Sequence, residues 1–344
     1  MSNSLDDVAE RAGVSPATVS RALRGLPRVS AATRAKVVAA AEALGYVISP
    51  SASRLATGRT HTMGVVVPYV SRWFFGQAIT GVEQVLRAHG FDLLLYNLGD
   101  DDGRDRFFRD MPLRRRVDAV VVLSLPLSEA EVDQLRGLRV PVALLGASVE
   151  PFGCVRIDDV AGATTAMRHL TNLGHHDIAL VSGGPAVPMR FTTPDDRRRA
   201  YIDVLASVGV DYDADLEAGG DFTVAGGQRA MSELLGRSRR PTAIFALSDE
   251  MALGAIRALR LSGLRVPDHM SVVGFDNHDM ADLLDLTTVG QPVVEQGEAC
   301  AHMLLDRLLA GGEPKHELRT LPTRLIVRGS TAPVAGGSPP AAAV

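Results

Sequence analysis

The stretch LDDVAERAGVSPATVSRAL, residues 5–23, predicts two short helices joined by a tight turn. The apolar residues of the first helix follow the i, i+3, i+4, i+7 pattern, and Gly13 is placed to end it. Ser15 is a good N-cap for the second helix, since Pro16 then stands at the first helical position, where its missing N–H costs nothing. Because only residues 13–15 separate the two helices, the spacing predicts a helix-turn-helix unit.

A third helix is predicted in the next stretch, VSAATRAKVVAAAEALGY, residues 29–46, with Ser30 as its cap and Gly45 at its end. In a helix-turn-helix protein the second helix enters the major groove by its N-terminus, so its early outward side chains reach the base edges. Arg21 can contact a guanine edge with two hydrogen bonds, and the methyl group of Ala17 can meet a thymine. The predicted base-reading set is Pro16, Ala17, Ser20 and Arg21.

Phosphate contacts are expected from residues that flank this helix. Ser4, Thr18 and Arg28 are placed to hold phosphates, and the cap residue Ser15 belongs to the same predicted interface. Residues 1–60 carry eight basic and four acidic side chains (+4), whereas the other 284 carry 28 basic and 36 acidic ones (−8). This asymmetry suggests that only the first 60 residues meet a polyanion. A small three-helix bundle without a DNA role remains the alternative.

Composition excludes several protein classes. In 344 residues, 46% are hydrophobic and 22% charged, which is ordinary for a globular protein and unlike a disordered one. No apolar run approaches the length of a membrane span, and no signal peptide is recognisable at the start. The two cysteines, Cys154 and Cys300, are too few for a disulfide framework or a cysteine-based zinc site. We therefore expect a soluble cytoplasmic protein without metal or cofactor.

The first 46 residues resemble the DNA-binding headpiece of the LacI/GalR family of bacterial transcription regulators. The likeness is gapless over residues 5–46 and is carried by the specific pattern DVAxxAGVSxxTVSR. In that family a hinge follows, whose leucine wedges into the minor groove from each half of a dimer. The matching segment SPSASRLATGRT, residues 49–60, places this leucine at Leu55. It departs from the family pattern, because Ile48-Ser49 replaces the usual Pro-Asn and the proline follows at Pro50.

Beyond residue 62, short apolar runs alternate with longer segments of helical period. The runs MGVVVP, FDLLLY, DAVVVL, PVALLG, DIALVS, TAIFAL and MSVVGF have little polar alternation, as is typical of parallel strands buried on both faces. Helical period is found at 76–89, 159–173, 195–208 and 249–261. About 270 residues of this pattern exceed one comfortable domain, so we expect an α/β architecture of two doubly wound lobes.

This part also resembles the family's effector-binding part, which is similar to periplasmic sugar-binding proteins. The likeness is strongest in LSDEMALGAIRALRLSGLRVPDHMSVVGFDN, residues 247–277, and the segments LTTVGQP and IDDVAGATTAMRHLTNLGH support it. The resemblance implies a headpiece (1–46), a hinge (47–61), an N-terminal effector lobe (62–160 plus 292–322), a C-terminal effector lobe (161–291 plus 323–330) and a disordered tail (331–344).

The resemblance also implies a ligand site in the crevice between the lobes. Residue by residue, the family's ligand contacts fall on Phe74, Phe75, Asp158, Arg197, Phe222, Asp276 and Gln291. Trp73, the only tryptophan, adds stacking area beside the Phe pair, and Arg190 lies in a longer segment that is expected to edge the crevice. Aromatic faces with Arg and Asp partners suit a sugar or a related metabolite.

Each assignment has an ordinary structural alternative. Phe75 and Phe222 could be plain core residues, Asp276 could cap a turn, and Arg197 stands in a run of three arginines that could be a solvated cluster. Two departures leave the ligand class open. Ser248 replaces the Asn of ribose-type binding proteins, and Gly146-Ala147-Ser148 replaces their Asp-Arg.

The leading hypothesis is a DNA-binding transcriptional regulator, with repression favoured, that binds a palindromic operator as a homodimer under the control of a small molecule. A dimer is favoured over a tetramer because no leucine-heptad tail follows residue 330. A free-standing sugar-binding transport protein would not need the charged helical head. A nucleotide-dependent enzyme is disfavoured because the phosphate-loop, dinucleotide and hydrolase motifs are missing.

Overall fold

The computed structural model describes residues 4–23, 27–46, 59–184, 189, 191–310 and 317–334. The chain divides into two units, Met1–Thr60 and His61–Val344. We call the first unit the head and the second the body. Among the described residues, no helix is both long enough and apolar enough to cross a membrane.

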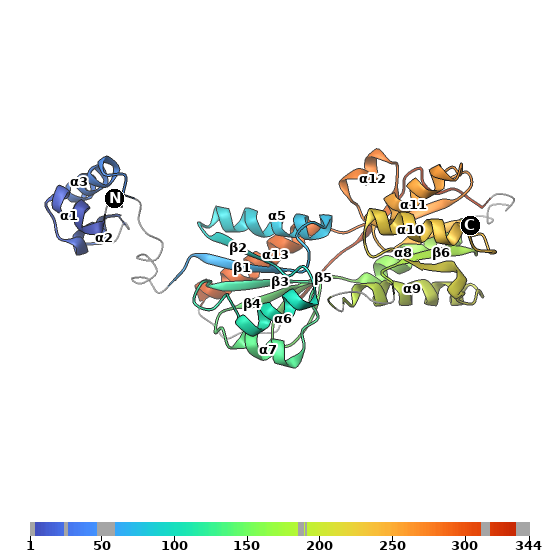
Figure 1. Ribbon diagram of the computed structural model, residues 1–344, viewed down its shortest axis with the longest axis horizontal. Coiled ribbons are helices and arrows are strands. Elements are labelled where there is room, and N and C mark those ends of the chain that lie inside the picture. Colours follow the sequence, from blue (N-terminus) through green and yellow to red (C-terminus); the bar gives the residue numbers. More distant parts are fainter. Residues whose placement is uncertain are drawn as a thin grey trace, which may run out of the picture. The chain divides into compact units, whose positions relative to one another are not determined.

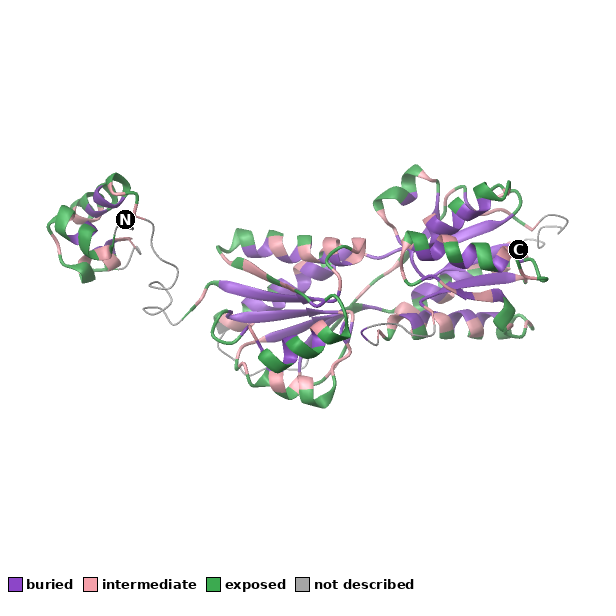
Figure 2. Ribbon diagram, in the orientation of Figure 1, coloured by how far each residue is buried: buried purple, intermediate pink, exposed green. Residues whose placement is uncertain are grey.

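The head consists of the three predicted helices, α1 (Leu5–Ala12), α2 (Pro16–Leu23) and α3 (Ala31–Ala43). They surround one small core in which Val8, Val19 and Val37 are fully buried. One valine comes from each helix, so the core holds all three together. Figure 2 shows that the helices of the head carry both buried and exposed segments. The helix-turn-helix prediction is therefore confirmed at the level of the fold.

Side-chain caps define where the helices of the head begin. Ser4 and Asp7 form a capping box, in which the Asp7 N–H donates to Ser4 Oγ (3.2 Å) and the Ser4 N–H donates to Asp7 Oδ2 (2.7 Å). The hydroxyl of Ser15 accepts from the Thr18 N–H at 3.2 Å and starts α2. Gly13 adopts φ 66°, which lets the chain leave α1 and turn directly into α2.

The N-terminal lobe of the body contains a six-stranded parallel sheet with the order β11-β5-β4-β3-β1-β2. Its strands are β1 (Thr62–Val67), β2 (Asp92–Asn97), β3 (Ala119–Leu123), β4 (Val142–Leu145), β5 (Gly153–Ile157) and β11 (Leu318–Leu321). Helices α5 (Trp73–Ala88) and α13 (Val293–Ala310) cover one face, and α6 (Asp101–Asp110) and α7 (Glu129–Arg136) cover the other (Figure 1).

The C-terminal lobe repeats this architecture with the strand order β12-β10-β9-β8-β6-β7. Only the edge strand β12 is antiparallel to its neighbour. The strands are β6 (Ile178–Ser182), β7 (Glu217–Gly219), β8 (Ala243–Ala246), β9 (Ser271–Asp276), β10 (Thr287–Gly290) and β12 (Arg324–Ile326). Helices α8 (Asp159–Asn172) and α9 (Thr193–Ser207) pack on one face, and α10 (Val224–Leu235) and α11 (Asp249–Leu261) on the other. The 3-10 turn η2 (Ala214–Leu216) and the short helix α12 (Asp279–Leu283) complete the lobe.

The chain passes between the lobes three times, after β5, after β10 and after β11. The first passage follows Ile157, since α8 begins at Asp159 and packs on the C-terminal sheet. This is slightly earlier than the expected end of the N-terminal segment at residue 160. At all three passages the chain leaves the carboxyl end of a strand, so these ends line the space between the lobes.

Two helices of the N-terminal lobe approach each other unusually closely. A Cβ on Gly81 of α5 would lie 2.0 Å from the carbonyl oxygen of Val294, and a Cβ on Gly297 of α13 would lie 2.1 Å from that of Ala78. Glycine at both positions therefore lets the two backbones pack against each other directly.

Two expectations from the sequence were wrong in detail. The run FDLLLY was expected to be buried on both faces, but β2 is an edge strand with an exposed Asp92 and a partly exposed Leu95. The start of the expected disordered tail is bound to the C-terminal lobe. The Val334 N–H donates to the carbonyl of Leu173 (3.0 Å), and the Ala332 N–H donates to Ser271 Oγ (3.0 Å). Backbone hydrogen bonds thus hold residues 331–334, and the rest of the expected tail lies outside the described residues.

Candidate nucleic-acid interface and ligand pocket

Helix α2 of the head has one buried and one exposed face. Val19 and Ala22 are buried in the core, whereas Pro16, Ala17 and Arg21 are exposed and Ser20 is half-buried. The residues predicted to read bases therefore share the face that the core leaves free. An exposed arginine and small neighbours near the N-terminus of a short helix fit the major groove.

The predicted phosphate contacts are arranged around the two helix starts. The hydroxyl of Ser4 donates to Asp7 Oδ2 (2.9 Å), and Ser15 Oγ lies 2.9 Å from Thr18 Oγ1. These hydroxyls therefore also position the helices. Arg28 is exposed and adopts φ 71° in the connection before α3. Leu55 lies outside the described residues.

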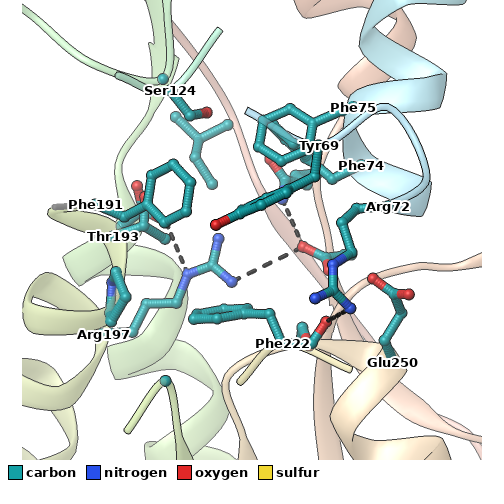
Figure 3. Close-up of a pocket in the computed structure, with 18 of the residues that line it drawn as sticks. Tyr69, Arg72, Phe74, Phe75, Ser124, Phe191, Thr193, Arg197, Phe222 and Glu250 are labelled. Atoms are coloured by element: carbon teal, nitrogen blue, oxygen red, sulfur yellow. Dashed lines mark hydrogen bonds and ion pairs between the residues drawn. The ribbon is translucent and has the colours of Figure 1, made fainter. Parts of the chain in front are cut away.

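A pocket of about 250 Å³ lies between the two lobes of the body. Both lobes contribute to its wall, mostly from segments that follow the carboxyl ends of strands. The lining residues are Tyr69, Arg72, Phe74, Phe75, Ser124, Gly146, Ile157, Asp159, Gly183, Phe191, Thr193, Pro194, Arg197, Asp221, Phe222, Ser248, Glu250, Asp276, Gln291 and Gln296. Figure 3 shows the rings of Tyr69, Phe191 and Phe222 around the guanidinium of Arg197.

Arg197 is the most constrained charged residue of the pocket. Its Nε donates to Asp159 Oδ1 (2.8 Å), and its Nη1 donates to the carbonyl of Leu247 and lies 3.8 Å from Asp276 Oδ1. The guanidinium carbon also lies 3.5 Å from the centre of the Phe275 ring. These contacts fix a buried cation in one orientation, as a binding site for polar groups requires. The alternative of a solvated cluster is therefore wrong for Arg197.

Asp276 is buried at the end of β9 and is linked to the crossover into α13. Gln291 Nε2 donates to Asp276 Oδ1 (2.6 Å), and Gln296 Nε2 donates to Gln291 Oε1 (3.0 Å). Burial raises the pKa of Asp276 to about 8, although the charge of Arg197 opposes this rise. Asp276 also has φ 125°, a strained conformation for a residue other than glycine. A buried, strained carboxyl group facing a cavity is typical of a functional site.

A second cation, Arg72, connects the lobes at another wall of the pocket. It precedes α5 in the N-terminal lobe, and its Nη1 donates to the carbonyl of Phe222 in the C-terminal lobe (3.1 Å). Burial raises the pKa of Glu250, and the positive charge of Arg72 acts in the opposite direction. Figure 3 shows Glu250 beside the Arg72 side chain.

Aromatic rings supply most of the apolar wall. Phe75 lies 5.2 Å from Phe74 and 6.4 Å from Phe191 between ring centres, and Phe191 lies 6.3 Å from Tyr69. Phe191 follows β6 of the C-terminal lobe but packs with the aromatic residues of the N-terminal lobe. Both lobes thus contribute to one aromatic surface.

The structure brings most of the predicted ligand contacts into this pocket. They are Phe74, Phe75, Arg197, Phe222, Ser248, Asp276 and Gln291. Ser248 has a second role, since its hydroxyl accepts from the Met251 N–H (3.3 Å) and caps α11.

Two predicted contacts do not line the pocket, and a third cannot be placed. Trp73 points to α12, where its Nε1 donates to Asp279 Oδ2 (3.1 Å) and its ring lies 5.0 Å from that of His278. Asp158 is exposed and caps α8, accepting from the Ala161 N–H (2.9 Å). Helical geometry then turns the following residue, Asp159, into the pocket. Arg190 lies outside the described residues.

Several lining residues were not predicted from the sequence. Gln296 lies one turn into α13 beyond Gln291, so helical spacing could have indicated it. Glu250 is the neighbour of the Asp in the SDEMA segment. No sequence motif around Ser124 indicated that it lines the pocket. A Cβ on Gly146 would lie 2.7 Å from Ser124 Oγ, so this hydroxyl occupies the space that a larger side chain at 146 would need.

Comparisons with known proteins agree with this arrangement. The family model described as "Bacterial regulatory proteins, lacI family" matches residues 4–49, and the model "Periplasmic binding protein-like domain" matches residues 167–331. The HTH-type transcriptional repressor CytR of Escherichia coli (strain K12) is 34% identical over 333 residues, which cover 95% of this chain and 96% of that protein.

Solved structures show the same likeness in three dimensions. The lac repressor dimer bound to operator and the anti-inducer ONPF superposes with a TM-score of 0.83 at 27% identity, covering 96% of this chain and 100% of that one. The complex of the transcriptional regulator CelR with cellobiose has a TM-score of 0.70 at 33% identity, covering 95% and 99%. This chain therefore belongs to the lacI family of bacterial regulatory proteins, and it is a DNA-binding transcriptional regulator rather than an enzyme or a transport protein.

Proposed function

We propose that the protein is a cytoplasmic repressor that binds a palindromic operator as a homodimer and is controlled by a neutral sugar bound between its lobes. The observation that carries the proposal is the pocket itself, which combines aromatic rings with polar side chains held in fixed positions. It lies in the same chain as a helix-turn-helix head with an exposed arginine on α2.

Similar proteins of known structure support this proposal. One solved neighbour is a transcriptional regulator in complex with cellobiose, and another is a repressor dimer bound to operator. A further neighbour, a regulator from Enterococcus faecium that is 31% identical, has ribose bound. A sugar effector, a duplex operator and a dimer are therefore the natural partners to test for this chain.

Charge in the pocket favours a neutral ligand over an anionic one. Two arginines, Arg72 and Arg197, line the pocket together with four acidic residues, Asp159, Asp221, Glu250 and Asp276. Arg197 is already paired with Asp159, so it carries no spare positive charge for a phosphate. Ring faces can cover the C–H patches of a sugar, while the fixed carboxyl groups and amides bind its hydroxyl groups.

In the head, Ala17 and Arg21 of α2 would read base edges together with Pro16 and Ser20. Ser4, Ser15, Thr18 and Arg28 would hold phosphates on either side, and Leu55 would enter the central minor groove. A twofold dimer presents two copies of α2, which requires a palindromic site. Repression needs only occlusion of a promoter, with no contact to other proteins.

Control follows from linkage between the two binding events. If a sugar favours one arrangement of the lobes, and that arrangement changes how well the heads fit the operator, then each ligand alters the affinity of the other by the same factor. Polar contacts join the lobes at the wall of the pocket, such as that of Arg72 to the Phe222 carbonyl, so a ligand there can act on how the lobes are arranged.

The test is thermal unfolding of the full chain against a panel of neutral sugars, with the corresponding sugar phosphates and nucleosides as comparison classes. A ligand at 100 times its dissociation constant stabilises a protein by about 2.7 kcal/mol, which shifts a melting curve measurably. A neutral sugar should raise the melting temperature, and its phosphate should not. A shift by sugar phosphates alone would contradict the proposed ligand class.

A further inference from the structure

A group of exposed arginines lies at one end of the N-terminal lobe, away from the ligand pocket. Arg114, Arg115 and Arg116 lie in the connection between α6 and β3, and all three are exposed. Arg109 in the last turn of α6 and Arg139 before β4 are also exposed. We call these five residues the basic edge.

The basic edge is not neutralised by ion pairs. Among the described residues, no carboxylate forms a salt bridge with any of its five arginines, whereas Arg104 and Arg136 nearby are paired with Glu131 and Asp133. The contact recorded for a guanidinium of the basic edge is neutral, from Arg116 Nη1 to the hydroxyl of Tyr96 (3.1 Å). The acidic neighbours of the basic edge in the sequence are Asp110, next to Arg109, and Asp118, two residues beyond Arg116.

The charge of these arginines contrasts with that of the unit that carries them. Residues 61–344 contain 28 basic and 36 acidic side chains, a net charge of −8. Five exposed arginines without carboxylate partners at one end of an acidic unit are a local positive field, and such a field attracts a polyanion.

Strand register shows which end of the lobe this is. Strands β1, β3 and β4 are parallel, with Met63 opposite Ala119 and Val120 opposite Val142. Their amino ends therefore lie at one edge of the sheet, and the arginines directly precede β3 and β4. The ligand pocket lies at the opposite, carboxyl ends.

The chain from the head reaches the body at this same edge. The His61 N–H donates to Asp118 Oδ2 (2.8 Å), and the Asp118 N–H donates to the carbonyl of Thr62 (2.8 Å). Asp118 is two residues beyond Arg116. The first residues of the body are thus hydrogen-bonded to the segment that carries three of the arginines.

A covalent tether limits how far the head can move from the basic edge. An extended chain spans at most ~3.6 Å per residue, so residues 47–60 allow about 50 Å at most between Tyr46 of the head and His61 of the body. Tethering of this kind raises the effective concentration of the DNA phosphates at the second surface. No other polyanion is brought there by the chain itself.

We propose that the basic edge is a second DNA-binding surface, which contacts the phosphate backbone of the operator or of its flanks while α2 reads the bases. Exposed arginines without a groove-entering element bind backbone phosphates and do not read sequence. Their contribution is therefore electrostatic, falls with rising salt and is independent of the base sequence.

The test measures operator affinity of the full chain against salt, with an operator selected by the unaltered protein from a random DNA library. The variant carries Arg114→Gln, Arg115→Gln and Arg116→Gln. Each lost phosphate contact lowers the slope of log K against log salt by about 0.9. We expect a slope lower by at least about 1 and a several-fold loss of affinity at low salt, with unchanged base preference.

The matched control removes the same charge from the C-terminal lobe. It carries Arg168→Gln, Arg240→Gln and Arg260→Gln, three exposed arginines that also lack a carboxylate partner among the described residues. A slope equal in the two triple variants would overturn the proposal. A second result would also overturn it, namely a basic-edge variant that binds DNA normally but no longer binds polyglutamate. These two observations together would assign the surface to an acidic protein.

Fragment length separates two locations of the contact, and both support the proposal. A larger effect on an operator with 20 added base pairs on each side places the contact on flanking DNA, and an equal effect on the bare operator places it within the site. Melting temperatures of the two triple variants check that both are folded, because all six side chains are exposed.

Discussion

Gln291 Nε2 donates to Asp276 Oδ1 across 2.6 Å and so connects the crossover into α13 with the last residue of β9. Gln296 of α13 extends this chain into the N-terminal lobe, and Arg197 of α9 faces the same carboxyl oxygen from the C-terminal lobe. A hydroxyl group that binds Asp276 would therefore act on contacts of both lobes. This relationship makes Asp276 the most informative residue of the pocket.

Asp276 should make the stability of the fold depend on pH. Its pKa is raised from 3.8 to about 8 by burial, so the folded chain keeps a proton that the unfolded chain releases. The free energy of unfolding should then fall as pH rises between about 4 and 8, by at most about 1.4 kcal/mol per pH unit from this group. Asp276→Asn removes the titrating group and leaves an oxygen that can accept from Gln291.

Urea unfolding at pH 5.5, 6.5 and 7.5 measures this effect. Burial raises the pKa of Asp249 to about 6, and this group titrates in both proteins. The charge of Asp249 also raises the pKa of Asp276, so the difference between the unaltered chain and Asp276→Asn reports Asp276 together with its interaction with Asp249. We expect the decline with pH to be shallower in the variant, and parallel declines would show that Asp276 is ionised in the fold.

Arg197→Lys should weaken sugar binding and also lower the stability of the fold. An ammonium group cannot keep the contacts to Asp159, the Leu247 carbonyl and the Phe275 ring at the same time. We expect a stability loss of about 1–3 kcal/mol and at least a tenfold weaker affinity for the sugar that stabilises the unaltered chain. Calorimetric titration and urea unfolding measure the two quantities.

Arg199→Lys is the matched control in the same helix. Its side chain is 60% exposed and pairs with Asp196 near the surface, where such pairs contribute little. Both quantities should stay unchanged. Equal loss of sugar affinity in the two variants would remove Arg197 from the site.

The close packing of α5 against α13 gives a stability prediction with an internal control. Gly81→Ala would push a Cβ to 2.0 Å from the Val294 carbonyl oxygen, whereas a Cβ on Gly76 of the same helix meets nothing within 4 Å. We expect Gly81→Ala to destabilise by several kcal/mol through overpacking. Gly76→Ala should be neutral or stabilising by up to about 1 kcal/mol. Melting curves that rank the variants the other way would contradict the packing described here.

In the head, Arg21→Ala should relax the base preference at one position of each half-site. Loss of a bidentate contact costs about 1–3 kcal/mol in discrimination. Binding to a library of single-base operator variants measures the preference at every position. Arg28→Ala, which removes a predicted phosphate contact, should weaken binding evenly across the library. An unaltered preference profile in Arg21→Ala would exclude this arginine from base reading.

The sequence predicted the positions of helices and strands better than it predicted which strand lies at the edge of a sheet. Helices such as α2 and α11 were predictable because a cap residue and apolar spacing mark them locally. The exposure of β2 depends on its place at the edge of the sheet, which is set by the strand order and not by FDLLLY itself. In the same way, the hydrogen bonds of residues 331–334 depend on partners such as Leu173, which is distant in the sequence.

The predictions for the pocket residues had the same limit. Family positions led to Phe222, Asp276 and Gln291, which line the cavity. Asp158 was predicted to contact ligand, but its side chain caps α8, and the next residue, Asp159, points into the pocket instead. Trp73 was also predicted to contact ligand, but its Nε1 donates to Asp279 of the C-terminal lobe instead. Such orientations depend on packing between distant segments, which spacing alone does not contain.

Control of DNA binding by the pocket can be measured as the affinity of the full chain for its selected operator with and without the stabilising sugar, in the unaltered protein and in Arg197→Lys. We expect that sugar at a concentration that half-saturates the unaltered protein changes its operator affinity measurably, up to at least fivefold at saturation and in either direction, and that the same half-saturating concentration changes the operator affinity of Arg197→Lys much less. Linkage also requires that operator DNA change sugar affinity by the same factor. A sugar that binds the pocket tightly and leaves operator affinity unaltered would show that the pocket does not control DNA binding.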